Sequence, residues 1–340
     1  MTFSNLNRRR CNFHWLLSLF LFSALTFVPS MISVAQAKAT TQRNPQAAWV
    51  YPIGEPGKPF GDGFSVRHGY ATENTWYNPG ALHTGEDWYL DDGNTAGAGV
   101  YAVADSEIVF AGSEYPGLVV IARHSGGLFS MYGHLDYELA VETGERVSRG
   151  QLLGTVLDRT DGRARSHLHF EIRTFQTTLE VNGDAPRYGY SCGYRCPPGP
   201  GYWPIDAPEH PSVIGWRNPA HVIASRAFEG SPPANAEVVV ASGSSVSAAL
   251  WSEPSDHAGA ERVGDLPLNP GERFQLTSIV AGLEASDETS AESYWLWYQI
   301  VVPDAGRVWV QAAIPSSGDT GSDGRPSTVR FDFLPVELVG

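Results

Sequence analysis

In the stretch SHLHFEIR, residues 166–173, polar and apolar side chains alternate from His167 onward. A period of two residues is typical of a β-strand. Residues two apart in a strand project from the same face. His167 and His169 are therefore expected side by side, with Leu168 and Phe170 on the opposite face. Two imidazoles aligned by a strand can bind a metal or share metal binding and proton transfer. A solvated polar strand face is the alternative.

Short apolar runs on both sides of this stretch have the same strand character. They are rich in β-branched and aromatic residues and are separated by Gly, Pro, Asn and Asp; examples are residues 99–104, 107–112, 118–122 and 128–132. Helical periodicity is nearly absent, and one short helix is expected near residues 219–224. The pattern predicts an all-β fold built from antiparallel sheets.

The N-terminal segment has the features of a targeting sequence. Three arginines at 8–10 precede an apolar run from about residue 15 to 34, and Ala35-Gln36-Ala37 follows. This order predicts a signal peptide, residues 1–37, and export to the periplasm, cell envelope or extracellular space. An uncleaved membrane anchor is the alternative, because the apolar run is long enough to span a bilayer.

The remainder divides into two predicted domains. A polar linker at 38–47 leads to a first domain at 48–226, and a Pro-rich linker at 227–236 leads to a second, strand-only region at 237–340. Within the first domain, residues 174–216 are rich in Gly, Pro and Tyr and are expected to form a long ordered loop.

Charge and cysteine content indicate which partners and which cross-links to expect. The formal net charge is −14, and no basic run lies beyond residues 8–10, which argues against a nucleic-acid partner. After export, Cys192 and Cys196 are expected to form a local disulfide. Half a metal site is the alternative. The chain is expected to be a monomer and to meet a membrane only if the signal segment is retained.

A second cluster adds further metal donors. His83 and Asp87 lie four residues apart, with Gly85 between them allowing a bend, and His134 stands alone between the clusters. A His/Asp/His set with an open position is the ligand class of a catalytic zinc. Such a zinc lowers the pKa of its water to about 7. His134 and one member of the 167/169 pair could then handle the proton and the oxyanion.

These motifs resemble the lysostaphin-type (LytM-like) zinc metallopeptidases, in the order and context of that family, over roughly residues 48–226. The resemblance implies that His83, Asp87 and His169 bind one zinc ion per chain and that His134 and His167 are the catalytic pair. It also implies a compact antiparallel β domain acting on peptides of bacterial peptidoglycan. The motifs are HTGED (83–87), VYAVADSEIVFAG (100–112), YGHL (132–135), GERVSRGQLLG (144–154) and HLHFE (167–171).

The C-terminal region resembles the bacterial SH3-like domains found beside cell-wall hydrolases. The resemblance implies a small β-barrel that binds the wall or positions the enzyme, although its tryptophans could simply fill a core. It rests on LWSEP (250–254), LNPGERFQL (268–276), WYQIVV (297–302) and GRVWV (306–310).

The sequence therefore predicts a secreted zinc metalloendopeptidase that hydrolyses peptidoglycan peptides. A non-catalytic wall-binding or hydrolase-activating protein and a zinc endopeptidase acting on proteins are the alternatives. Glu86 and Glu171 are expected to be exposed, although either could orient a ligand. His124 is expected at a strand end, where it faces solvent or hydrogen-bonds a loop, and His221 is expected on the surface.

Overall fold

A computed structural model of the chain describes residues 48–337, apart from 76, 161, 163, 179–180, 182–197, 255–257, 286–293 and 321–325. The predicted signal peptide, the linker at 38–47 and the Cys192–Cys196 pair lie outside the described residues. Within the described part of the chain, no helix is both long and apolar enough to cross a membrane.

Nearly every regular element is a strand, as the short alternating runs predict. The helices are η1 (Ser125–Gly127), α1 (Pro211–Ile214) and α2 (Pro219–Ser225). The strands are β1 (Ile53–Gly54), β2 (Phe64–His68), β3 (Glu73–Asn74), β4 (Asn78–His83), β5 (Glu86–Leu90), β6 (Gly99–Tyr101), β7 (Ser106–Tyr115), β8 (Gly117–Arg123), β9 (Phe129–Leu135), β10 (Arg146–Val147), β11 (Leu152–Thr155), β12 (Leu168–Arg173), β13 (Tyr202–Pro204), β14 (Trp216–Arg217), β15 (Ala236–Val240), β16 (Ser247–Trp251), β17 (Arg262–Pro267), β18 (Arg273–Ala281), β19 (Leu296–Val302), β20 (Gly306–Gln311), β21 (Ala313–Thr320), β22 (Pro326–Phe331) and β23 (Phe333–Glu337).

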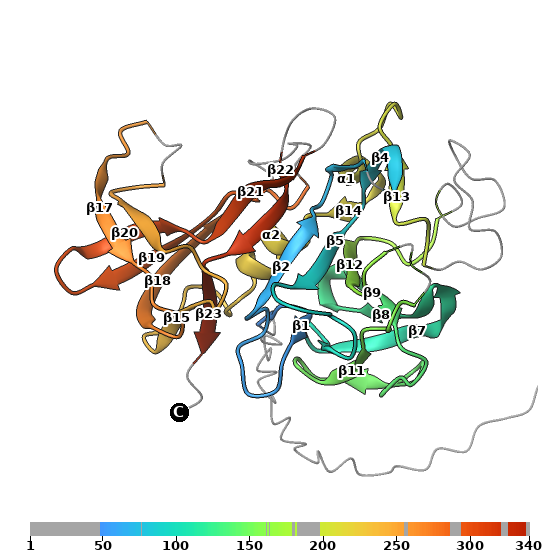
Figure 1. Ribbon diagram of the computed structural model, residues 1–340. Coiled ribbons are helices and arrows are strands. Elements are labelled where there is room, and N and C mark those ends of the chain that lie inside the picture. The colour runs from blue at the N-terminus through green and yellow to red at the C-terminus, as the bar shows by residue number, and fades with distance from the viewer. Residues whose placement is uncertain are drawn as a thin grey trace, which may run out of the picture. The chain divides into compact units, whose positions relative to one another are not determined.

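The largest sheet follows the order β10-β7-β8-β9-β12-β5-β2-β22-β21, with β14 paired to β12 (Figure 1). Its central pairs are antiparallel, which confirms the predicted fold class. The last two strands come from beyond the predicted linker at 227–236, and Val66 of β2 is in register with Val329 of β22. Strands from both predicted domains therefore share one sheet; the domain boundaries themselves stay a prediction.

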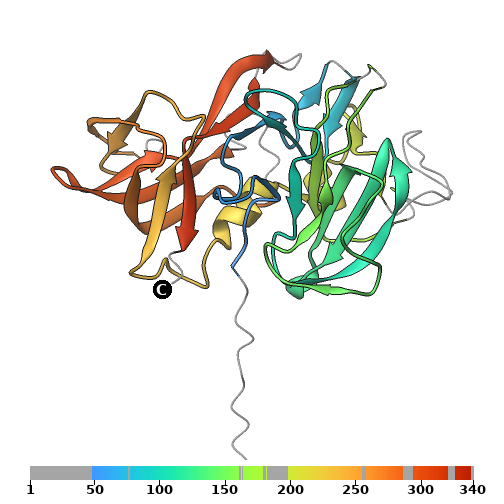
Figure 2. The same ribbon diagram turned by 60° about the horizontal axis from the view of Figure 1, so that its bottom comes forward.

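The other C-terminal strands, coloured orange to red in Figure 2, form a second sheet. Its strand order is β17-β16-β20-β19-β18-β15-β23. In the described part of this sheet, β17 and β23 are its two ends and do not pair. The closed small barrel expected from the sequence is therefore not found. The reason is that β21 and β22, which follow β20 directly, leave this sheet and extend the larger one instead.

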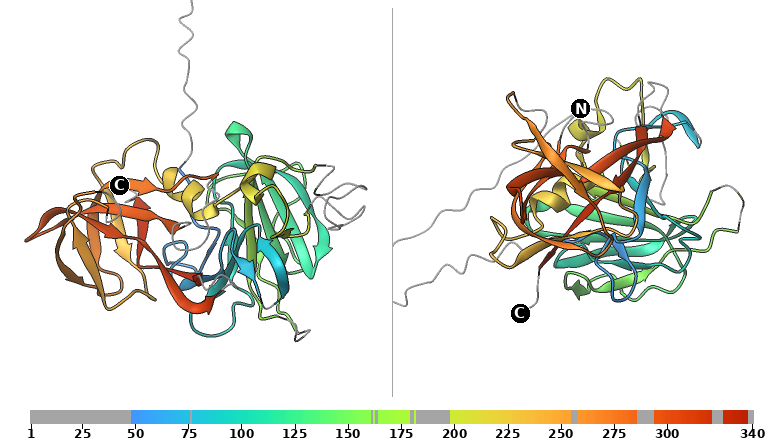
Figure 3. Two further views of the ribbon diagram at one scale, coloured as in Figure 1. Left: turned by 90° about the horizontal axis from the view of Figure 1, so that it is seen from above. Right: turned by 60° about the vertical axis from the view of Figure 1, so that its left-hand side comes forward.

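Helix α2 is the short helix that the sequence predicts, and it lies between the two groups of strands (Figure 3). Pro219 opens it, where its fixed φ suits the first turn. The Asn218 side-chain oxygen accepts a hydrogen bond from the backbone N–H of His221 at 3.2 Å, which caps the helix. The helix contacts β12 of the large sheet and β18 of the second sheet.

A continuous apolar core joins the N-terminal and C-terminal strands. Trp88 of β5 stacks on Phe331 at the end of β22, with ring centroids 5.3 Å apart and an interplanar angle of 4°. Tyr51 packs against both rings, with its centroid 5.1 Å from that of Phe331 and 5.4 Å from that of Trp88. Both Trp88 and Phe331 are buried. The C-terminal segment thus supplies part of the core under the strand that carries Asp87.

Truncating that phenyl ring should destabilise the whole molecule. We expect Phe331→Ala to lower the free energy of unfolding by about 3–5 kcal/mol, because it leaves a cavity beside Trp88 and Tyr51. Urea denaturation followed by tryptophan fluorescence measures the change. The matched control is Val263→Ala on exposed β17, expected to stay within about 0.5 kcal/mol of the parent. Equal effects of the two substitutions would contradict a shared core.

Candidate metal centre

Strand register brings two of the predicted site residues together. In β12, His169 pairs with Asp87 of β5 on one side and with Gly133 of β9 on the other. His134, the next residue of β9, therefore lies beside the same point of the sheet. Three neighbouring antiparallel strands place one carboxylate and two imidazoles within a few ångströms, because register fixes which residues face one another.

His83 reaches this point from the end of β4, through the bend that leads into β5. Gly85 lies in that bend, as the sequence predicts, and its lack of a side chain has a second reason. A Cβ at this position would lie 2.3 Å from the Phe170 carbonyl oxygen. The bend can therefore press against β12 only with glycine at residue 85, and this contact brings His83 to His169.

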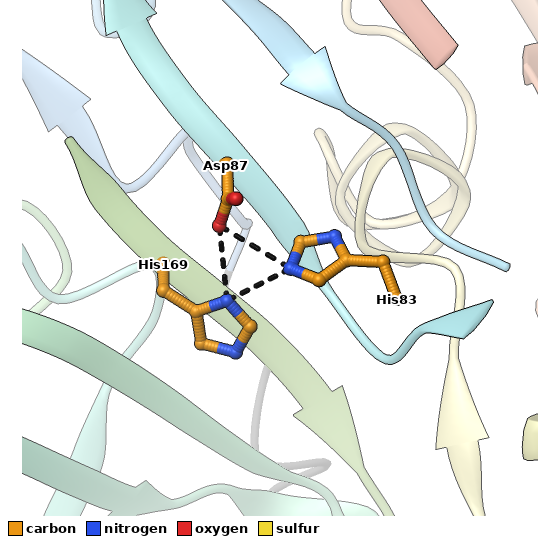
Figure 4. A group of neighbouring side chains, drawn as sticks. All are labelled: His83, Asp87 and His169. Atoms are coloured by element: carbon orange, nitrogen blue, oxygen red, sulfur yellow. Dashed lines mark hydrogen bonds and ion pairs between the residues drawn. The ribbon is translucent and has the colours of Figure 1, made fainter. Parts of the chain in front are cut away.

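Three donor atoms of these residues form a small triangle (Figure 4). The Nε2 of His83 lies 3.0 Å from the Nδ1 of His169. The Oδ1 of Asp87 lies 3.0 Å from the His169 Nδ1 and 3.2 Å from the His83 Nε2. For a tetrahedral zinc with bonds of about 2.0–2.1 Å, ligand atoms are about 3.3 Å apart. The triangle is close to this size, and nitrogen with carboxylate oxygen is a donor set that zinc accepts.

Proton positions show why the triangle favours a cation. The His83 Nδ1 lies 3.1 Å from the His68 carbonyl, and the His169 Nε2 lies 3.0 Å from Glu171 Oε1. A carbonyl or carboxylate oxygen only accepts, so each of these nitrogens carries the hydrogen. In the neutral imidazoles, the opposite nitrogens present lone pairs to Asp87. Three electron-rich atoms thus converge, and a proton or a metal must lie among them.

The electrostatics of His169 agree with this conclusion. Burial alone lowers the pKa of an imidazole, but hydrogen bonds to Asp87 and Glu171 raise the pKa of His169 to about 9. Burial also disfavours the charged form of Asp87, yet the neighbouring His83 and His167 hold its pKa well below the usual range. The protein therefore stabilises positive charge at this point, and His83, Asp87 and His169 can hold a metal ion.

His134 and His167 stand beside the triangle. Their rings are 4.6 Å apart, and the His167 Nε2 lies 3.7 Å from Asp87 Oδ1. Each donates its Nδ1 hydrogen to a backbone carbonyl, of Pro116 at 3.0 Å and of Arg165 at 2.7 Å, respectively. Burial lowers the pKa of both, so the neutral forms prevail and each Nε2 is the nitrogen that can accept a proton.

The backbone at His134 is unusual. Its φ is 62°, and Ala71 is the only other non-glycine residue with positive φ among the described residues. In a residue other than glycine, such a backbone conformation costs about 1–3 kcal/mol of folding free energy, and it is frequent at functional positions. The structure thus brings together all five residues singled out from the sequence.

Glu171 is a member of the site that was expected to be exposed and is instead fully buried. Its Oε1 accepts hydrogen bonds from His169 and from Thr84 Oγ1 at 2.8 Å, and its Oε2 accepts from Trp216 Nε1 at 2.9 Å. Burial opposes its charge, but Arg173 and His169 lower its pKa to about 2. The strand period held the signal, because residues 167, 169 and 171 share one face.

Two other expectations of exposure, for Glu86 and His221, are wrong. Glu86 is fully buried, with Trp88 Nε1 donating to its Oε2 at 3.1 Å and the Ala220 N–H donating to its Oε1 at 3.2 Å. Burial raises the pKa of Glu86 to about 8. His221 is buried as well, and burial lowers its pKa to about 4. His124, expected to face solvent or to hydrogen-bond a loop, is also buried, and burial lowers its pKa to about 4. The partners of Glu86 and His221 lie far away in sequence, which is why local pattern could not reveal them.

Residues 81–182 match the model of Peptidase family M23, and this span contains all five site residues. The catalytic domain of the antimicrobial peptidase lysostaphin from Staphylococcus simulans is 27% identical, over 31% of this chain and 76% of that chain, with a TM-score of 0.26. A zinc containing peptidase from Vibrio cholerae is 24% identical, over 37% of this chain and 36% of that chain, with a TM-score of 0.27. A chain of the SpoIIQ-SpoIIIAH pore forming complex is 26% identical, over 38% of this chain and 84% of that chain, with a TM-score of 0.28. A search of curated proteins gave no match. The family match supports a peptidase, in agreement with the motifs.

The buried carboxyl of Glu86 predicts a stability that depends on pH. Its pKa rises from 4.5 in the unfolded chain to about 8 in the folded one. Between pH 4.5 and pH 8, the folded protein therefore keeps a proton on Glu86 that the unfolded chain has lost. This contribution is complete below pH 4.5 and is lost as the pH rises through 8, by up to about 1.4 kcal/mol per pH unit. Glu86→Gln should remove this slope. Urea unfolding of both proteins at pH 5, 7 and 9 measures it, and parallel curves would contradict the assignment.

The triangle predicts zinc-linked stability. With free zinc at a hundred times its Kd, the gain is about 2.7 kcal/mol, or a rise in Tm of roughly 5–10 °C. Asp87→Ala should abolish the rise, because only two donors remain. His210→Ala is the matched control: this histidine caps α1 and is not one of the three donors, so the variant should keep the full shift. Differential scanning fluorimetry with and without zinc, preceded by chelation, decides the matter. An undiminished shift in Asp87→Ala would place the metal elsewhere.

Proposed function

We propose that this protein is a zinc metalloendopeptidase that hydrolyses peptide bonds of bacterial peptidoglycan. One observation carries the proposal: three lone pairs converge within 3.2 Å beside two buried, neutral imidazoles. His83, Asp87 and His169 would hold one zinc ion per chain. The family match over residues 81–182 supports peptide hydrolysis as the reaction class.

The residues around the metal divide the chemistry between them. Zinc, when bound, supplies a Lewis acid that polarises a carbonyl and makes water acidic at neutral pH. The Nε2 atoms of His134 and His167 take the two remaining tasks: one accepts the proton of the attacking water and passes it to the leaving amine, and the other, once its Nε2 has taken up a proton, donates to the developing oxyanion. Their Nδ1–carbonyl hydrogen bonds fix the ring orientation that both tasks need.

Glu171 would orient His169 toward the metal. A carboxylate that accepts from the far nitrogen of a metal-bound imidazole fixes its tautomer and raises its basicity. Here the carboxylate is itself held by Thr84 and Trp216, so His169 has little rotational freedom. An intact donor set with an oriented ligand favours a catalyst over a non-catalytic wall-binding protein.

The remaining parts of the proposal concern location and targeting. We infer export to the periplasm, cell envelope or extracellular space from residues 1–37, and a monomer as the working form. Residues 237–340 would act as the SH3-like, wall-binding part, although their described strands form an open sheet. A peptidase acting on proteins is the competing function, and the substrate panel below separates the two.

Substitution of the two proton-handling histidines should separate catalysis from metal binding. His134→Ala and His167→Ala should each lower kcat/KM by about 10²–10⁴-fold while zinc content stays near one per chain. His169→Ala should lose zinc and activity together. Metal content is measured by inductively coupled plasma mass spectrometry, and muropeptide release from purified sacculi by chromatography with mass analysis.

The same assay includes two controls. His210→Ala should keep zinc and activity, and casein as a second substrate tests the protein-directed alternative. Cleavage of casein without release of muropeptides would replace the wall by protein as substrate. A His169→Ala protein with full zinc and full activity would falsify the site assignment.

A further inference from the structure

A groove of about 660 Å³ is lined by residues that neighbour His167. Tyr89 lines the groove, and its ring stacks on the His167 imidazole at 4.9 Å with an interplanar angle of 20°. Arg165 and Ser166, which immediately precede His167, line it too. The volume is within the range of about 300–1,000 Å³ that is typical of ligand sites. A molecule in this groove therefore lies against Tyr89, whose ring contacts one of the two proton-handling residues.

The charge of the groove is opposite to that of the chain. Three arginines, Arg67, Arg159 and Arg165, are among its described lining residues, against a single carboxylate, Asp91. The whole chain has 23 lysines and arginines and 37 acidic residues. Clustering of three of these few cations in one concave site, in a protein of net charge −14, favours an anionic ligand group.

One wall of the groove comes from the C-terminal strand β22. Thr328 lines the groove, and its hydroxyl donates to the Arg67 carbonyl at 3.2 Å. The neighbouring Ser327 hydroxyl donates to the same carbonyl at 3.2 Å. Figure 1 shows β22 running beside β2, the strand that carries Arg67. The C-terminal segment therefore holds the backbone from which Arg67 extends.

The aromatic lining suits a peptide. The Arg67 guanidinium lies 5.3 Å from the centre of the Tyr89 ring, and Tyr77 is 43% exposed on the same groove. Tyrosine rings beside a guanidinium give a surface that packs on peptide planes and side chains next to a positive charge. The strong negative charge of the whole chain disfavours a polyanion such as nucleic acid as the ligand. A small molecule or peptide with a single anionic group is therefore the better fit.

We propose that this arginine groove, defined by Arg67, Arg159 and Arg165, binds a carboxylate of the peptide substrate and makes the protein selective for acidic peptides. The inference rests on the proposed peptidase function, since the peptide must extend from the metal centre past His167. Arginine suits this role because its planar guanidinium can hold a carboxylate through two parallel hydrogen bonds. A carboxylate beside the scissile bond, either on a side chain or at the peptide end, would be the recognised group.

The test compares carboxylates with carboxamides. Cross-linked muropeptides with free carboxyl groups, and the same muropeptides after conversion to carboxamides, serve as paired substrates. The parent protein should prefer the free acids by about tenfold in kcat/KM, chiefly through KM, since a partly exposed arginine–carboxylate contact is screened by water. In Arg67→Gln and Arg165→Gln this ratio should fall toward one. Arg67→Lys, which keeps the charge but not the fork, should restore part of it.

Arg146→Gln is the matched control. It removes the same charge from an exposed position on β10, at the opposite end of the large sheet, and should leave the ratio at its parent value. Thermal unfolding of each variant confirms that it is folded. Synthetic peptides with an amidated C-terminus and a side-chain carboxylate, or the reverse, show which of the two carboxylates is recognised.

Binding separates this inference from the proposed function. Titration calorimetry of the paired muropeptides with the zinc-free protein measures the carboxylate preference without turnover. A preference that depends on Arg67 and Arg165, in a protein that cleaves neither muropeptide when loaded with zinc, would uphold the groove and refute the hydrolysis. Cleavage with an acid-to-amide ratio near one in the parent, or an unchanged ratio in both arginine variants, would overturn the groove as a carboxylate site.

Discussion

The pairing of β12 with β5 on one side and β9 on the other sets the position of every reactive group in the centre. His169 is opposite Asp87 and Gly133 in the two ladders, so a shift of one residue in either register would turn a donor away from the others. The bend at Gly85 then carries His83 into the same space, because no Cβ intervenes between that bend and the Phe170 carbonyl. Backbone geometry, rather than side-chain reach, builds the metal centre.

Positively and negatively charged side chains alternate along this buried region. Arg173 lies next to Glu171, Glu171 accepts from His169, and the donor triangle ends at Asp87. Each buried charge thus has an opposite neighbour, which offsets the large cost of removing it from water. Without a metal, a proton on His169 completes the series; with one, the cation takes that place. The electrostatic design explains how so many ionisable groups tolerate burial beside one another.

Local pattern was enough for the parts of the site that depend on strand period. The alternation in residues 166–173 predicted a shared face for His167 and His169, and the same period could have added Glu171. The family resemblance joined these residues to His83, Asp87 and His134, which spacing alone left open. The sequence pattern did not reveal contacts between residues far apart in the chain. Glu86 accepts a hydrogen bond from the Ala220 N–H, and His221 lies 3.3 Å from the Leu283 carbonyl. The prediction of a closed barrel was wrong for the same reason, because Val329 pairs with Val66, a residue far away in the sequence.

The pairing of β2 with β22 has a consequence for the integrity of the molecule. A strand edge without a neighbour offers its N–H and C=O groups to any other extended chain, and proteins normally cover or charge such edges. Here the cover for β2 is supplied by a strand more than 250 residues later in the chain. Proteolytic removal of the C-terminal segment would uncover both that edge and the aromatic face of Trp88. The trimmed molecule would then be prone to self-association, so the tail also acts as a safeguard against aggregation.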